Sequence, residues 1–116
     1  MQPLGKSTDI KRAFQEGARA YSPWAVLHAR RREEGISEAR LAIIAGKRFR
    51  HSVPRNRARR LLRETARGLL GRNPLPWDLL LVARTDVLES TFQERTNALR
   101  EMLRKVGVLE ETGCPA

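Results

Sequence analysis

The segment KRFRHSVPRNRARRLLRETAR, residues 47–67, predicts a helix that is apolar on one side and strongly basic on the other. Proline is favoured in the first turn of a helix and pushes the residue before it out of helical geometry, so we expect the helix to begin at Pro54. At about 100° per residue, one side collects the residues that can be buried: Ala58, Leu61, Leu62, Thr65 and Leu69. The other side collects polar and basic residues: Arg55, Asn56, Arg59, Arg60, Arg63 and Arg67, with Arg57 further round. One side can therefore pack on a sheet while the other remains in solvent.

Positive charge is concentrated around this helix. The net charge of the chain is +10, and residues 30–72 hold fourteen Lys or Arg against four Asp or Glu, which accounts for the whole excess. Guanidinium groups crowded in this way repel one another unless anions lie across them, and a local basic surface is typical of nucleic-acid binding. The loop before the helix adds three candidate contacts: Lys47, Arg48 and Arg50.

Length and composition restrict the class of protein. A chain of 116 residues suits one domain, 1–116, and we expect loose ends at about residues 1–6 and 108–116. Cys114 is the only cysteine, so the chain can form neither a disulfide framework nor a cysteine metal site. No stretch approaches the roughly 20 apolar residues of a membrane span, and the N-terminus lacks the apolar core of a signal peptide. We therefore expect a cytoplasmic protein with no membrane partner.

The first expected element is a short helix over residues 7–17, which Ser7 or Thr8 can cap. Its apolar side is defined by residues at helical spacing: Ile10, Ala13, Phe14 and Gly17. So short a helix is stable only against a partner, so it either packs on a sheet or also presents Phe14 to a groove.

Two strands are expected next. WAVLHAR, residues 24–30, alternates with Val26 and His28 on one side, and ARLAIIAG, residues 39–46, is more apolar. The charged residues between them predict a turn, so we expect the two strands to form a hairpin. His28 is more typical of a hydrogen-bonded strand residue than of a catalyst, because no acid or nucleophile is evidently paired with it.

The remaining elements complete an α+β fold. DLLLVAR, residues 78–84, is a continuous apolar run that indicates a strand inside the sheet. Thr91 and Glu94 form a capping box for a last helix that ends at Gly107. Its expected apolar stripe is Phe92, Thr96, Leu99, Leu103 and Val106. The predicted order is α-β-β-α-β-α, a single small domain with helices against one mixed sheet.

No pattern in the sequence indicates a protein active site. It contains no Gly-rich phosphate loop, metal-ligand cluster, GxSxG motif or evident pair of catalytic carboxylates. We therefore predict no catalytic residue and no protein metal site, and a function that depends on binding. The alternatives left open are a structural RNA-binding protein of ribosomal type, a DNA-binding regulator and a self-sufficient nuclease. A regulator should show a helix-turn-helix pair, which is not visible, so we expect no DNA partner.

The segment AIIAGKRFRHSVPRNRARRLLR, residues 42–63, resembles the signature of the bacterial ribonuclease P protein component. The hallmark of that family is an Arg-Asn-Arg core followed by basic residues on the same helix. Here these are Arg55, Asn56 and Arg57, then Arg59, Arg60 and Arg63. IKRAFQEG, AVLHA and DLLLVAR are similar to the family's first helix, first main strand and later strand. The tripeptide alone is weak evidence for the family, but the combined match in the order of the elements, the length of the chain and the charge is specific.

The resemblance implies a ribosomal protein S5 domain 2-like fold, with a left-handed crossover joining two parallel strands through the basic helix. It implies the protein subunit of a ribonucleoprotein endoribonuclease that removes the 5′ leader of precursor tRNA. Its partners would be the catalytic ribonuclease P RNA, which performs the cleavage with RNA-bound Mg²⁺, and the leader itself. The leader would lie in a cleft between the sheet and the first helix: Ile10, Phe14, Val26, His28 and Ile44.

This chain departs from the family pattern at four positions. Ile10 and His28 stand where aromatic residues are common, which leaves Phe14 as the one clear aromatic residue of the expected cleft. Arg50 and His51 stand where Gly and Asn are usual, so the loop before the helix is more basic.

Overall fold

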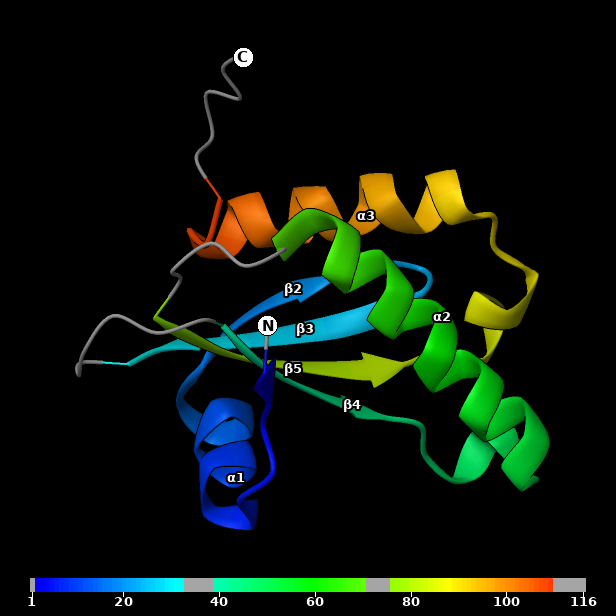
Figure 1. Cartoon of the computed structure of the whole chain (residues 1–116), viewed down its shortest axis with the longest axis horizontal. Coiled ribbons are helices and arrows are strands. Elements are labelled where there is room, and N and C mark those ends of the chain that lie inside the picture. The colour runs from blue at the N-terminus through cyan, green and yellow to red at the C-terminus, as the bar shows by residue number, and fades with distance from the viewer. Residues whose placement is uncertain (1, 33–38, 71–75, 110–116) are drawn as a thin grey trace.

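A five-stranded mixed sheet forms the middle layer of the fold, with its strands in the order β1-β4-β5-β3-β2 (Figure 1). The computed structural model describes residues 2–32, 39–70 and 76–109. The strands are β1 (Gln2–Pro3), β2 (Ala18–Tyr21), β3 (Ala25–Arg31), β4 (Arg40–Ile44) and β5 (Trp77–Ala83). The helices are α1 (Ser7–Glu16), α2 (Ser52–Leu70) and α3 (Phe92–Val106), with short 3₁₀ helices η1 (Lys47–Phe49) and η2 (Thr85–Glu89). The expected α+β class is confirmed, and β1 and β2 are added to the expected order.

The pairing of the strands corrects one prediction. β3 and β4 do not form a hairpin, because β5 lies between them, antiparallel to β3 and parallel to β4. The three leucines of β5 are buried, as the continuous apolar run predicted for an interior strand. Helix α2 connects the parallel strands β4 and β5, as the expected crossover requires.

The three helices divide between the two faces of the sheet. α2 and α3 pack together on one face, and α1 packs on the other, against β3 and β5 (Figure 1). Alternate residues of the central strands face α2 and α3, among them Leu27, Leu79 and Leu81. They form the main core together with Leu62 of α2 and Leu103 of α3. This core fixes the orientation of α2 on the sheet and so leaves its basic side in solvent.

Both ends of the described chain are better anchored than expected. β1 pairs with β4, Leu4 is buried, and its backbone N–H donates to the Leu41 carbonyl at 2.8 Å. Val108 is also buried, after Gly107 ends α3 in the left-handed conformation with φ 91°. The expectation of loose ends therefore does not hold for residues 2–4, where β1 pairs with β4 and Leu4 is buried, or for Val108, which packs in the core. Residues 1 and 110–116 lie outside the described residues.

The helix starts agree only in part with the sequence predictions. The capping box of α3 is confirmed, with hydrogen bonds of 2.9 and 3.1 Å between Thr91 and Glu94. α2 begins at Ser52, before Pro54, which is tolerated because the first-turn amide groups have no partner inside the helix. α1 follows Lys6, and neither Ser7 nor Thr8 caps it; both lie inside its first turn.

The buried side of α3 is also rotated from the predicted stripe. Phe92 is 54% exposed, whereas Arg95 is buried. The Arg95 guanidinium donates to Thr65 Oγ1 of α2 at 3.2 Å and to the Ser90 carbonyl at 2.8 Å. A buried arginine thus joins α3 to α2, and burial lowers the pKa of Arg95.

Gly17 ends α1 where the chain passes close to β3. A Cβ atom at this position would lie 2.9 Å from the Ala29 carbonyl oxygen and closer still to the carbonyl oxygen of Ala13. Because both are backbone atoms, we expect Gly17→Ala to lower the free energy of unfolding by about 1–3 kcal/mol. The matched control is Gly68→Ala in α2, where no atom crowds the new methyl group, and we expect it to add about 0.5–1 kcal/mol. Urea unfolding measures both, and equal effects would contradict the close approach at Gly17.

Candidate nucleic-acid interface

Helix α2 buries one side, and that side is rotated slightly from the prediction. Three of the predicted residues are buried: Ala58, Leu62 and Thr65. Two others are only half-buried, at the border: Leu61 and Leu69. Ala66 and Leu70 are buried in their place. The buried side of α2 packs against α3, where Thr65 accepts a hydrogen bond from Arg95.

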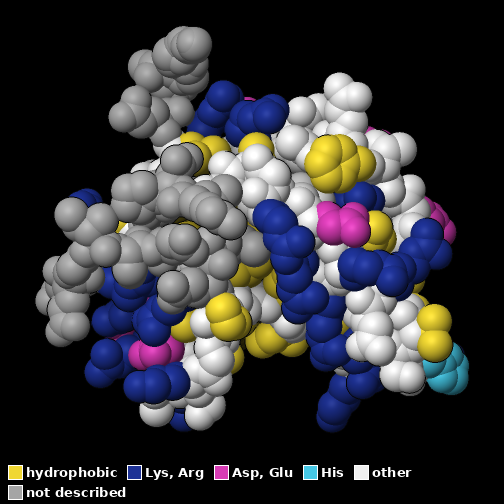
Figure 2. All heavy atoms as spheres, in the orientation of Figure 1, with side chains coloured by type: hydrophobic (Ala, Val, Ile, Leu, Met, Phe, Trp, Pro, Cys, Tyr) yellow, Lys and Arg dark blue, Asp and Glu magenta, His cyan; other side chains and the backbone are white. Residues whose placement is uncertain are grey.

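The basic side of α2 is open to solvent. Figure 2 shows Lys and Arg side chains following this helix across the molecule. The exposed members of the predicted set are Asn56, Arg57, Arg60, Arg63 and Arg67, and the half-buried ones are Arg55 and Arg59. Asn56 Oδ1 accepts a hydrogen bond of 3.1 Å from Arg59, which orients that guanidinium. The Nε of Arg55 is buried and has no hydrogen-bond partner among the described residues. The helix thus presents an array of cationic donors.

The loop before α2 extends this basic surface. Lys47, Arg48 and Arg50 are all exposed, and η1 is anchored beneath them by the buried ring of Phe49. Arg50 has φ 62°, a backbone conformation that favours glycine. Glycine would adopt that conformation without strain, so Arg50 adds a cation at the cost of local strain.

The α1 side of the sheet can be described as three rows of side chains that cross the strands. Residues paired across neighbouring strands point to the same face, so the register defines each row. The first row lies under α1 and is charged: Arg30, Asp78 and Arg40. Asp78 is fully buried and accepts hydrogen bonds from Arg32 at 2.6 Å and from Arg40 at 2.7 and 2.8 Å. Burial acts to raise the pKa of Asp78, but the hydrogen bonds from Arg40 and Arg32 outweigh it and hold the pKa below its ordinary value.

The second row is covered by an aromatic side chain of α1. It contains Arg19, His28, Leu80 and Ala42. The Phe14 ring stacks on His28 with centroids 4.7 Å apart, and Phe14 itself remains 48% exposed. Burial lowers the pKa of His28, the nearby charge of Arg19 lowers it further, and the Phe14 backbone only partly opposes them. The imidazole is therefore harder to protonate than an ordinary histidine, and its ring supports Phe14 from below.

The third row is the exposed part of the sheet. It contains Tyr21, Val26, Val82 and Ile44, one from each of four neighbouring strands. Val26 and Val82 are half-buried, while Tyr21 and Ile44 are exposed. An apolar strip across a sheet is unusual on a solvent-facing surface and is typical of a binding site.

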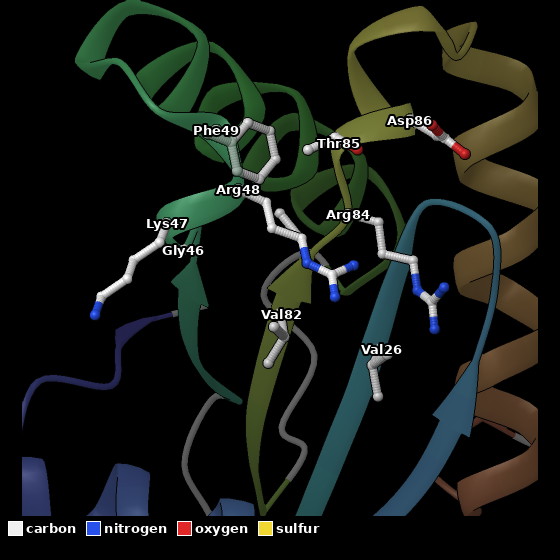
Figure 3. A pocket seen from close by; sticks show the side chains of 10 residues that line it. Val26, Gly46, Lys47, Arg48, Phe49, Val82, Arg84, Thr85 and Asp86 are labelled. Carbon is white, nitrogen blue, oxygen red and sulfur yellow. The ribbon is translucent and has the colours of Figure 1, made fainter.

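A pocket of about 470 Å³ lies beside the middle of this apolar row, next to η1 and η2. Val26 and Val82 form its floor, and the side chains of Arg48 and Arg84 extend toward them (Figure 3). The carboxylate of Asp86 lies at the far edge of the view, away from the two valines (Figure 3). The pocket thus combines an apolar floor with two guanidinium groups.

The predicted leader-cleft residues come together on this side of the molecule, with one correction. Val26 and Ile44 share the third row, and Phe14 lies over the second. Ile10 is half-buried on α1. His28 is only 4% exposed, so it cannot form part of an open floor. The alternating pattern of β3 correctly predicted which face of the sheet His28 lies on, but it could not predict that Phe14 covers it.

Sequence reasoning missed three residues at the edges of this surface: Arg19, Tyr21 and Arg84. β2 is only four residues long and three of them are exposed, so its pattern gave no strand signal. Arg84 stands out in the sequence only as the end of an apolar strand. Strand register, which the sequence did not supply, brings Arg19 and Tyr21 to this face, and Arg84 lines the pocket beside Val26 and Val82.

Two further observations concern the described residues alone. They contain no group of three His, Cys, Asp or Glu side chains placed to hold a metal ion. Their helices include none that is both long and apolar enough to cross a membrane.

Comparisons with known proteins agree with this architecture. The family model for ribonuclease P matches residues 2–107. The ribonuclease P protein component of Gluconacetobacter diazotrophicus is 35% identical over 106 residues, which cover 90% of each chain. That of Chloroflexus aurantiacus is 33% identical over 110 residues, covering 91% of this chain and 78% of the relative.

Solved structures show the same fold. The ribonuclease P protein of Staphylococcus aureus superposes with a TM-score of 0.76 at 23% identity and covers 93% of this chain and 97% of its own. That of Thermotoga maritima gives a TM-score of 0.72 at 22% identity, with 91% and 98% covered. The match along residues 2–107, together with relatives above 30% identity, shows that this chain belongs to the family of bacterial ribonuclease P protein components.

Proposed function

We propose that this subunit binds the catalytic RNA of ribonuclease P through the basic side of α2 and holds the 5′ leader of precursor tRNA on the open sheet. The observation that carries the proposal is the arrangement of two different surfaces at one end of the molecule. Exposed arginines line α2 and η1, and η1 borders the pocket whose floor is the middle of the apolar row. Family membership favours this role over the ribosomal and DNA-binding alternatives.

The basic side of α2 suits a folded RNA. A structured RNA presents closely spaced phosphates, and each neutralised phosphate releases counterions, which makes binding tight at low salt. Arginine also donates in a planar fork that matches two phosphate oxygens. The hydrogen bond between Asn56 and Arg59 orients one such fork before RNA arrives.

The open sheet suits a single strand. Unpaired RNA exposes the faces of its bases, and proteins that bind it commonly stack bases on aromatic side chains of a sheet. Here Phe14 offers a half-exposed ring, and Val26 and Val82 offer a flat apolar floor beside Arg48 and Arg84. The leader is the single-stranded part of precursor tRNA, so this surface distinguishes precursor from mature tRNA.

The cleavage chemistry is assigned to the RNA. The described acids form no metal-binding group, and the one fully buried carboxylate among them, Asp78, is occupied by two arginines. The Mg²⁺ required for endonucleolytic cleavage would be held by RNA phosphates, and the protein would contribute binding and position. Such a tRNA-processing ribonucleoprotein would act in the cytoplasm.

The role of α2 can be tested by removing two of its charges. We expect Arg55→Ala with Arg59→Ala to reduce the slope of log affinity against log salt by about two, or one for each phosphate that the helix no longer neutralises. The free energy of unfolding should change little, because neither side chain is fully buried. Filter binding to a bacterial ribonuclease P RNA at several salt concentrations measures the slope.

A matched pair of arginines on α3 provides the control. Arg100→Ala with Arg104→Ala removes the same charge from another helix, and we expect the salt slope to be unchanged. If both double variants reduced the slope equally, attraction would depend on net charge alone and α2 would not be the interface.

A further inference from the structure

We infer that Tyr21 stacks on a base of the leader at the outer edge of the sheet. The leader would then cross four strands along the row from Ile44 to Tyr21, so that its recognition extends beyond the cleft beneath α1. This inference rests on the proposed binding of the leader to the open sheet, and it adds a base-binding position on β2.

The register places Tyr21 in line with the apolar floor. Tyr21 is paired with Val26, Val26 with Val82, and Val82 with Ile44. Paired residues point to the same face, and neighbouring strands are about 4.8 Å apart, so the row is roughly 14 Å long. A row of this length across four of the five strands is comparable to the four-stranded sheet on which RNA-binding domains stack two or three bases.

Exposure distinguishes Tyr21 from the other aromatic residues on this side. Its side chain is 61% exposed, compared with 48% for Phe14. A tyrosine ring left open on a sheet face is costly to hydrate and offers a large flat surface at little cost in conformational entropy. The position therefore favours contact with a planar partner.

Charge indicates that this partner is a nucleic acid. Arg19 lies two residues before Tyr21 on the same face of β2, and its guanidinium is 5.9 Å from the Phe14 ring centroid. A cation thus lies beside the Phe14 ring and on the same face of β2 as Tyr21, which suits a phosphate of an RNA strand whose bases stack on these rings. Arg48 and Arg84 supply cations at the pocket beside Val26 and Val82.

The position of α2 indicates in which direction the leader would cross the sheet. β4 leads through η1 directly into α2, so the Ile44 end of the row is next to the proposed site for the catalytic RNA. Tyr21 lies at the opposite end, on the edge strand β2. Tyr21 would therefore contact a base further from the cleavage point than those at the pocket.

The test uses the holoenzyme reconstituted with a bacterial ribonuclease P RNA, and equilibrium binding of precursor and mature tRNA under conditions that block cleavage. We expect Tyr21→Ala to weaken precursor binding about 5- to 10-fold, at the lower end of the range for a stacked base, and to leave mature tRNA binding unchanged. Tyr21→Phe retains the ring and should bind like the original protein. Phe92→Ala removes an exposed aromatic residue from α3 and should have no effect.

Leader length and a fluorescent base sharpen the test. As the leader is shortened from its 5′ end, the Tyr21→Ala defect should disappear before the defect of Phe14→Ala. A 2-aminopurine placed in the leader should be quenched at one distal position, and Tyr21→Ala should restore its fluorescence. Thermal melts of all variants establish that they are folded.

The outcomes separate the two proposals. If Phe14→Ala weakens precursor binding while Tyr21→Ala matches Phe92→Ala, the leader ends before β2 and the inference about Tyr21 is wrong. Equal losses for precursor and mature tRNA in Tyr21→Ala would overturn it as well. If the original holoenzyme binds precursor and mature tRNA equally, the proposed function of the open sheet fails first.

Discussion

Replacing Asp78 with Asn is expected to lower the free energy of unfolding by about 3–5 kcal/mol, the largest loss of stability that we expect from one polar side chain in this protein. The carboxylate is fully buried and receives three charge-assisted hydrogen bonds from Arg32 and Arg40. Asparagine keeps the shape but removes the charge, so two guanidinium groups are left side by side under α1. Chemical denaturation of the variant measures the loss.

A nearby acid provides the control for this prediction. The Asp9 carboxylate of α1 lies 3.6 Å from the Arg40 guanidinium, further than that of Asp78, and is more exposed to solvent. We therefore expect Asp9→Asn to lower the free energy of unfolding by less than about 1 kcal/mol. Comparable losses in the two variants would contradict the assignment of Asp78 as the centre of this cluster.

The same carboxylate predicts a dependence of stability on pH. Because the folded pKa of Asp78 is below that of an unfolded Asp, the ion pairs contribute fully above about pH 4 and are lost as the pH falls through the folded value. Asp78→Asn should therefore remove part of the acid sensitivity seen in the original protein. Denaturation curves between pH 2 and pH 6, a range set by about two units either side of an ordinary Asp pKa, measure this difference.

Patterns with a strong local cause were predictable from the sequence. The basic and apolar sides of α2, the interior position of β5 and the capping box of α3 each depend on residues close in the chain. The helical spacing of α2, the apolar run of β5 and the capping box of α3 each involve residues only a few positions apart, and the structure reproduces all three. The family resemblance added the association of α1 with the open sheet.

Features that depend on pairing between distant segments were not predictable in this way. The position of β5 between β3 and β4, and the short strands β1 and β2, follow from register rather than from local propensity. Register also determines that Tyr21 lies in line with Ile44, which is 23 positions further along the chain. The candidate site could therefore be predicted at α2 and Phe14, but not at Arg19, Tyr21 or Arg84.

The burial of charged and polar side chains was the second feature that the sequence could not predict. Arginine is usually a surface residue, yet Arg95 is buried and joins α3 to α2 through its hydrogen bond to Thr65. His28 alternates as an open strand residue should, yet Phe14 covers it. In both cases a side chain from another element supplies the partner or the cover, and a single segment of sequence cannot show it.

Dependence on RNA is the second large effect that we expect. In the proposed function the protein supplies cations and a surface for a single strand, and the described residues include no group of three His, Cys, Asp or Glu placed to hold a metal ion. Cleavage should therefore be absent with protein alone. Addition of the protein to a bacterial ribonuclease P RNA should accelerate leader removal most at low Mg²⁺, because the arginines of α2 replace part of the counterion charge that the RNA otherwise needs.

The measurement that tests this account most directly is single-turnover cleavage of 5′-labelled precursor tRNA by the protein, by a bacterial ribonuclease P RNA and by both together, across a range of Mg²⁺ concentrations. We predict no cleavage by the protein, slow cleavage by the RNA at low Mg²⁺, and fast cleavage at the same bond by the two combined. Cleavage by protein that is free of RNA, or an RNA reaction that the protein leaves unchanged at every Mg²⁺ concentration, would contradict the account.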